Sequence, residues 1–153
     1  MSSFDLRRLH APRRLSAVAL AMACTGGLAA AASAATLHVR VTPASIHKKT
    51  NFQIVITGTY NRSELKGNAY LVSFIQYNLK PCKPGAGQEL HAFGQNPFTH
   101  QNTGSSPFGW QFTFTAGGAG ARRVCAYLYP KQVGPTSTIA PLKRATTTYQ
   151  VKR

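Results

Sequence analysis

The stretch RRVCAYLYP, residues Arg122 to Pro130, contains the strongest indication of the fold. Cys125 is surrounded by valine, tyrosine and leucine, and residues of this kind favour β-strands. Pro130 ends the run, because proline cannot continue the hydrogen-bonded ladder of a central strand. We therefore expect a buried strand that carries a cysteine near its start.

The rest of the chain repeats this pattern of short strands separated by turns. Apolar and polar side chains alternate in most segments, which is typical of strands with one buried face. Residues 68–78 are instead apolar on both faces, as in a central strand covered on each side. These patterns predict an antiparallel β-sandwich of about seven strands, with a barrel as the alternative. The expected strands cover residues 36–42, 51–60, 68–78, 89–93, 108–116, 122–129 and 144–152.

Two parts of the chain resemble the secreted immunoglobulin-like domains of bacteria. The stretch LHVRVTPASIHKKTNFQIVITGTY is similar to their first two strands, and RRVCAYLYP followed by STIAPLKRATTTYQVK is similar to their last hairpin. The chain differs from antibody domains, because Cys82 follows the third expected strand and Trp110 lies well beyond it. Arg123 also stands where a tyrosine corner requires tyrosine. The resemblance implies a sandwich fold and no particular activity.

The first 34 residues have the composition of an export signal. An apolar run follows an arginine-rich start and ends in Ala32-Ser33-Ala34, the small residues that a signal peptidase accepts. The run is too short for a lasting membrane span, and no other span is expected. We therefore expect a signal peptide over residues 1–34 and one domain over 35–153, with lipid attachment at Cys24 as the alternative. The arginines of the start are Arg7, Arg8, Arg13 and Arg14.

Removal of the leader leaves Cys82 and Cys125 as the two remaining cysteines. Exported proteins meet an oxidising environment, so one disulfide bond between them is expected. If consecutive strands cross the sandwich in opposite directions, both cysteines lie at the same end, and the resemblance to immunoglobulin-like domains implies that their strands are neighbours. We therefore expect the bridge to join the third and sixth strands at that end.

The exported domain is strongly basic. Fourteen of the 18 Lys and Arg residues lie beyond the leader with only two acids, Glu64 and Glu89, and 14 minus two gives a net charge of +12. The alternation of strand directions assigns eight of these cations, with Glu89, to the end that holds the bridge. They are Lys48, Lys49, Lys80, Lys83, Arg122, Arg123, Lys152 and Arg153. The opposite end receives Glu64 with Arg62, Lys66, Lys131, Lys143 and Arg144.

A cationic end of this kind is expected to attract polyanions, such as anionic polymers or lipid headgroups of the cell envelope. The alternative is a purely structural domain whose strand ends are simply solvated, since lysines are common at such positions. The sequence has no basic strand studded with aromatic residues, so we expect no specific nucleic-acid partner.

The scarcity of carboxylates argues against catalysis. Glu64 and Glu89 are expected at opposite ends, too far apart for a glycosidase pair, and no aspartate remains to support a serine triad. The four histidines beyond the leader lack the spacing of a metal site, so we expect no enzyme, no cofactor and no metal. They are His38, His47, His91 and His100.

The uncharged stretch 94–107 is long for a sandwich loop, and long loops are either functional or flexible. It offers amides and a histidine around Phe98, which suits a neutral sugar by hydrogen bonding and stacking. Carbohydrate binding is therefore an alternative function, through Asn96, Phe98, His100, Gln101 and Asn102.

Overall fold

The computed structural model describes residues 35–93 and 96–153, and the expected signal peptide lies outside the described residues. The strands are β1 (Thr36–Thr42), β2 (Ser45–His47), β3 (Asn51–Thr59), β4 (Tyr70–Tyr77), β5 (Thr99–Asn102), β6 (Phe108–Thr115), β7 (Gly120–Tyr129) and β8 (Lys143–Lys152). The helices are α1 (Arg62–Leu65) and α2 (Ala86–Phe93). In this part of the chain no helix is long and apolar enough to cross a membrane.

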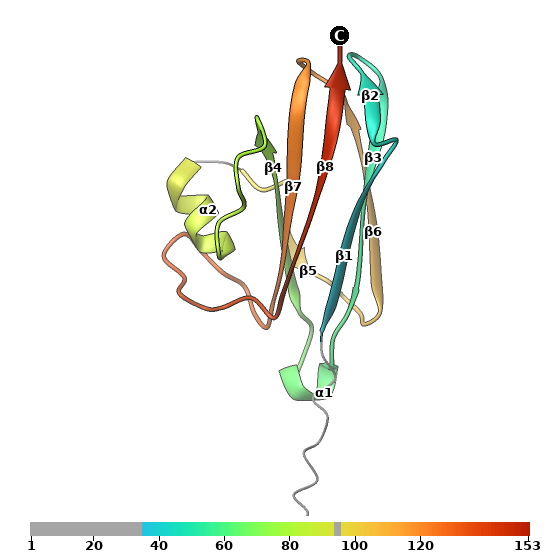
Figure 1. The fold of residues 1–153 in the computed structure, drawn as a ribbon. Coiled ribbons are helices and arrows are strands. Elements are labelled where there is room, and N and C mark those ends of the chain that lie inside the picture. The colour runs from blue at the N-terminus through green and yellow to red at the C-terminus, as the bar shows by residue number, and fades with distance from the viewer. Residues whose placement is uncertain (1–34, 94–95) are drawn as a thin grey trace, which may run out of the picture. The chain divides into compact units, whose positions relative to one another are not determined.

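The strands form two sheets that pack face to face (Figure 1). One sheet has the order β1-β3-β6, and the other has the order β2-β8-β7-β4-β5. All pairs are antiparallel except β2 with β8. The first, second and fifth of the expected strands therefore share one sheet, and the third, sixth and seventh share the other. This connectivity defines an immunoglobulin-like β-sandwich, and the expectation from the sequence is confirmed.

The main core lies between the two sheets and follows the period-two pattern of the sequence. Phe52, Ile54 and Ile56 of β3 point inward and are almost fully buried. Val124 and Leu128 of β7 meet them from the other sheet. Burial of each such side chain contributes roughly 1.5–3 kcal/mol, so the two sheets are held together mainly by the hydrophobic effect.

Strand β4 is buried on both faces, as its continuous apolar sequence predicts. Leu71 points into the main core, whereas Val72 and Phe74 belong to a second apolar cluster on the outer face of the five-stranded sheet. Helix α2 and the connections around it cover this cluster (Figure 1). A third layer on one side of the sandwich therefore explains why both faces of β4 are apolar.

The expected strand at residues 89–93 is wrong, because these residues belong to helix α2. Ala86 and Glu89 are buried while Gln88 and His91 are exposed, which is a helical spacing that a five-residue window hid. Gly87 permits a close approach of the next connection, because a Cβ there would meet the Ser137 carbonyl oxygen at 2.6 Å. The strand that follows β4 is β5, inside the stretch expected to be a loop.

The disulfide bond joins Cys82 and Cys125, whose Cα atoms lie 5.7 Å apart, so the expected pairing is confirmed. Its expected position is wrong. Cys125 lies opposite Phe74 and Thr146 in the middle of the sheet, not at its end. Cys82 belongs to residues 79–85, which we call the covering segment. The bridge therefore fastens the covering segment onto the outer face of β7.

Candidate functional site

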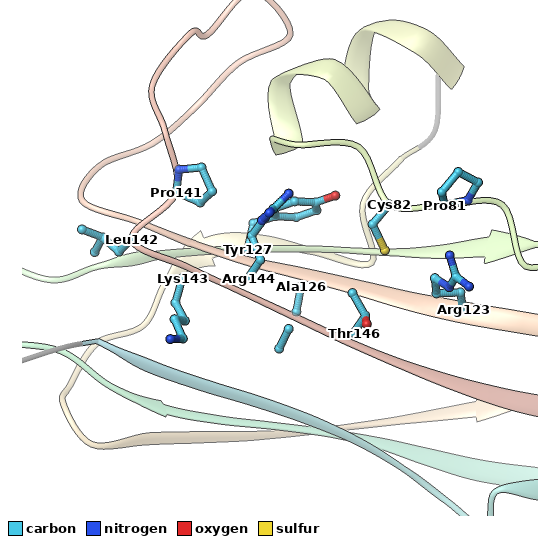
Figure 2. Close-up of a pocket in the computed structure, with 11 residues that line it drawn as sticks. Pro81, Cys82, Arg123, Ala126, Tyr127, Pro141, Leu142, Lys143, Arg144 and Thr146 are labelled. Atoms are coloured by element: carbon cyan, nitrogen blue, oxygen red, sulfur yellow. The ribbon is translucent and has the colours of Figure 1, made fainter.

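A cationic groove lies on the outer face of the five-stranded sheet (Figure 2). Its volume is about 630 Å³, and its floor is formed by β7 and β8. The covering segment forms one wall with Pro81 and Cys82, and the connection before β8 forms the other with Pro141 and Leu142. The charged residues in its lining are Arg123, Lys143 and Arg144, and the Lys143 side chain points to the opposite side of β8 from that of Arg144 (Figure 2). We call this site the arginine groove.

The register of β7 and β8 brings these cations together. Arg123 lies opposite Thr148, and Tyr127 lies opposite Arg144. Arg123 and Arg144 were expected at opposite ends of the sandwich, whereas the structure places both in one groove. The assignment failed because the covering segment folds back along the sheet, so the groove extends over several residues of each strand.

Each groove arginine is held by a backbone carbonyl of the covering segment. Arg144 Nη1 donates to the Pro84 carbonyl oxygen at 3.4 Å, and Arg123 Nη1 donates to the Lys80 carbonyl oxygen at 3.5 Å. These are long bonds to neutral acceptors, so most of the guanidinium N–H groups remain available for a ligand. An anion that reaches both arginines receives bidentate hydrogen bonds as well as charge.

A second group of cations lies at the end of the sandwich where β8 ends. Lys48 and Lys49 precede β3 and are tied to this end by their backbones: Lys48 N–H donates to the Lys152 carbonyl at 3.0 Å, and Lys49 N–H donates to the Ala116 carbonyl at 2.8 Å. The side chains of Lys48, Lys49, Lys152 and Arg153 are all exposed. We call these four residues the cationic end.

Arg122, by contrast, has a structural role. Its side chain is only 7% exposed, and its guanidinium stacks on the Tyr77 ring at 4.3 Å from the ring centre. Arg122 Nη2 also donates to the Gly118 carbonyl oxygen at 2.7 Å. Its hydrogen-bonding capacity is therefore used inside the protein, and it is not counted among the residues that can meet a ligand.

The structure places Lys83 away from the cationic end, in the covering segment beside α2. Its backbone N–H donates to the Glu89 carboxylate at 2.7 Å, and its carbonyl oxygen accepts from the Tyr127 hydroxyl at 2.8 Å. Lys80 also belongs to the covering segment, and its carbonyl oxygen accepts from Arg123 Nη1 at 3.5 Å. Of the eight cations that the sequence analysis gathered, four form the cationic end and Arg123 belongs to the groove.

Glu89 was expected at the cationic end, and this expectation is wrong. Glu89 lies on the buried face of α2 and is fully buried. Its carboxylate accepts from Gln76 Nε2 at 2.7 Å, from the Lys83 N–H at 2.7 Å and from the Tyr127 hydroxyl at 3.0 Å. Burial, and then the proximity of Glu89, raise the pKa of Tyr127 far above its usual value. Glu89 therefore fastens the outer layer and has no access to a ligand.

The other acid, Glu64, belongs to α1, at the far end of the sandwich from the cationic end (Figure 1). It is exposed and accepts a hydrogen bond from Asn61 Nδ2 at 2.8 Å, which supports the helix start. Neither acid lines the arginine groove, and one of the two is sealed from solvent. The two carboxylates are held by separate helices and do not form a catalytic pair.

Among the described residues, no group of three metal-binding side chains comes together. Three of the histidines are exposed on different elements: His38 on β1, His47 on β2 and His91 on α2. The fourth, His100, packs against Tyr70, and its Nε2 lies 2.8 Å from the Val133 carbonyl oxygen.

The side chains proposed for sugar binding are dispersed. Phe98 packs edge-on against Phe112 and Phe114, with ring centres 5.2 and 5.3 Å away. Asn102 Oδ1 accepts from the Gly104 N–H at 2.7 Å, while Asn96 and Phe98 together line a small cavity of about 230 Å³. The ring expected to stack on a sugar therefore packs on the aromatic residues of β6 and also lines this cavity, away from Asn102.

No protein-family model matches this chain, and no curated protein matches it in sequence. Several solved structures are similar at low identity. The CARDB domain of a Pyrococcus furiosus protein has 12% identity and a TM-score of 0.43, over 76% of this chain and 91% of that domain. A superoxide reductase (neelaredoxin) from Ignicoccus hospitalis has 12% identity and a TM-score of 0.41, over 76% and 80%.

A PKD domain of an M14-like peptidase from a Thermoplasmatales archaeon is also similar, with 12% identity and a TM-score of 0.37 over 76% of this chain and 96% of that one. Similarities this low carry no information about activity. The function is therefore argued from the residues of this chain.

Proposed function

We propose that residues 35–153 form an exported, non-catalytic immunoglobulin-like module that binds linear anionic polymers of the cell envelope. The observation that carries the proposal is the arginine groove, which contains Arg123 and Arg144 and has no acid in its lining. Clefts lined by one sign of charge concentrate the field and raise the local concentration of the opposite charge.

The arrangement suits an extended ligand better than a small anion. Arg144 and Lys152 both point outward from β8 and are eight residues apart, a distance of about 27 Å along an antiparallel strand. Thr146 and Thr148 lie between them on the same face and are exposed, so their hydroxyls are available to anionic oxygens. A polymer that follows β8 would therefore meet cations at both ends of its path and hydrogen-bond donors between.

The outer face of β8 also disfavours single-stranded nucleic acid as the ligand. Such ligands need exposed aromatic rings on which bases stack, and the outward residues of β8 are arginine, threonine, glutamine and lysine. The neighbouring Tyr127 and Tyr129 of β7 are buried beneath α2 and its connections. A polyphosphate or a sulfated or carboxylated polysaccharide fits these donors without stacking.

The proposal is tested by titrating the folded domain with inorganic polyphosphate, with neutral dextran as the control polymer. We expect affinity for polyphosphate that falls as salt rises, because screening weakens exposed charge pairs. The double variant Arg123→Gln with Arg144→Gln should weaken binding by about tenfold or more, since charge-assisted bonds contribute roughly 1.5–3 kcal/mol each when fully formed.

A matched control removes the same charge far from the groove. Arg62 and Lys66 are exposed at the opposite end of the sandwich, and the variant Arg62→Gln with Lys66→Gln should bind almost normally. Equal losses for both double variants would show a response to net charge alone and would contradict a groove site. No affinity at low salt would leave the purely structural role as the function.

Export is a separate part of the proposal and has its own test. The N-terminus of the exported protein, measured by mass spectrometry, should be Ala35 or Thr36. A lipid-modified Cys24 at the N-terminus would mean that the domain is anchored, and full-length intracellular protein would overturn export.

A further inference from the structure

The two sheets have four edge strands, and three of them are protected against pairing with another chain. β2 has three residues and β5 has four, and short edges pair poorly. β1 carries the exposed Arg40 on its outer face, and charge also discourages edge pairing. β6 has eight residues and no charge. It is therefore the one long, uncharged edge in the described part of the chain.

The free edge of β6 presents a regular row of backbone groups. Ala116 N–H donates to the Thr50 carbonyl at 2.8 Å, and the ladder continues in the same register along β3. Every second residue of an antiparallel strand bonds to the same neighbour. The residues of even number in β6 therefore bond β3, and those of odd number direct N–H and C=O away from it. The latter are Gly109, Gln111, Thr113 and Thr115.

The sandwich is also incompletely closed beside this edge. Trp110, Phe112 and Phe114 point inward from β6 and are partly buried, with Phe98 packed edge-on against Phe112 and Phe114. In the opposite sheet, β5 pairs with β4 only over Tyr70 to Ser73. Among the described strands, none pairs with this edge of β4 beyond Ser73. Aromatic surface beside an unpaired strand edge is typical of a site that receives another strand.

We propose that β6 pairs antiparallel with β6 of a second copy of this chain, which joins the two three-stranded sheets into one. A twofold axis at Phe112 places Gln111 opposite Thr113 of the other copy and Gly109 opposite Thr115. Every outward backbone group of β6 then has a partner, giving about eight hydrogen bonds. On the inner face, Trp110 meets Phe114 of the other copy, and such aromatic pairs stabilise antiparallel strands.

A second copy is the fitting occupant because the sequence of β6 complements itself. In this register no charged residue faces another, and each copy covers the half-buried aromatic rings of its partner. The net charge of the exported domain opposes association, but its cations lie on other strands and turns. Salt screens this repulsion. Dimer formation should therefore strengthen with salt, opposite in sign to polyphosphate binding.

The test uses the disulfide-bonded domain and charge placed at the interface. Gln111 and Thr113 are exposed, so lysine at both positions leaves the monomer core untouched. In the dimer, each introduced lysine would lie directly opposite an introduced lysine of the other copy, and like charges in this position destabilise a strand pair. Sedimentation equilibrium should show that Gln111→Lys with Thr113→Lys raises the dimer dissociation constant by about tenfold or more.

One control variant and two further measurements test the proposed interface. The variant Thr57→Lys with Thr148→Lys adds the same charge at exposed positions of central strands and should dimerise normally. An equimolar mixture of the interface lysine variant with Gln111→Glu plus Thr113→Glu should form a heterodimer, because opposite charges then face each other. Trp110, the single tryptophan, should show fluorescence that shifts with concentration in the wild-type domain. A monomer at every concentration and salt, or equal weakening by both lysine variants, would overturn the proposal.

Discussion

The Tyr127 hydroxyl lies 3.0 Å from a Glu89 carboxylate oxygen, inside the outer layer of the sandwich. The same oxygen accepts the Lys83 N–H, and the second oxygen accepts from Gln76. One side chain of α2 thus joins a strand, a neighbouring strand and the covering segment. Glu89, one of the two carboxylates considered for catalysis, therefore has a structural role. Its hydrogen bonds hold α2 and the covering segment, which forms one wall of the arginine groove, on the sheet.

Glu89→Gln should therefore destabilise the domain. The substitution keeps the shape but replaces one accepting oxygen by an NH₂ group that faces other donors, so buried hydrogen bonds are lost at a cost of about 1–3 kcal/mol. Urea denaturation measures the change. The control Glu64→Gln alters an exposed acid and should cost well under about 1 kcal/mol. Equal stability of the two variants would contradict the role assigned to Glu89.

Loss of the disulfide should affect both stability and the groove. The bridge spans 43 residues of sequence, and Cys82→Ser with Cys125→Ser is expected to cost about 2–5 kcal/mol, measured as a lower Tm. Because Cys82 lines the groove, polyphosphate binding should also weaken at temperatures where the domain stays folded. Denatured, unreduced protein should contain no free thiol from these residues, and two thiols per chain would refute the bond.

The neighbours Arg122 and Arg123 should behave in opposite ways. Arg122→Gln loses the stack on Tyr77 and the bond to Gly118, so it should cost about 1–3 kcal/mol of stability. Arg123→Gln should leave stability almost unchanged and weaken polyphosphate binding. Chemical denaturation and polymer titration of the two single variants measure both effects. A larger binding loss for Arg122→Gln, with stability intact, would reverse the assignment.

Buried tyrosines should make the domain sensitive to alkali. Burial raises the pKa of Tyr149 to about 12, an effect that Arg122 partly offsets, and burial also raises the pKa of Tyr129. Tyrosine in the unfolded chain ionises near about pH 10, so the unfolded state releases protons first. The stabilisation from the neutral Tyr149 is complete below about pH 10 and is lost as the pH rises towards 12.

The Tm should accordingly fall steeply between about pH 10 and pH 12. Tyr149→Phe removes one of the groups that titrate and should make this fall shallower than in the wild-type domain. Absorbance of tyrosinate during alkaline titration checks the order of ionisation. An unchanged pH profile in Tyr149→Phe would show that the loss of stability has another origin.

The strands of the main core were predictable from local patterns in the sequence. In β1, β3 and β6 one face is buried, so apolar and polar residues alternate along each strand. Because this pattern is local, the bounds of these strands were predicted to within about one or two residues. The two-sided apolar run of β4 correctly indicated a covered central strand. The disulfide pairing also followed from the sequence, since Cys82 and Cys125 are the two cysteines beyond the expected leader.

The positions of the charged groups and of the bridge, by contrast, depend on tertiary contacts. Folding of the covering segment back over β7 moved Lys83 away from the cationic end and the bridge to the middle of the sheet. The register across the long connection between β7 and β8 brought Arg144 to the groove that holds Arg123. No local pattern specifies these placements, because they depend on burial of the outer cluster beneath α2 and on contacts between residues distant in sequence.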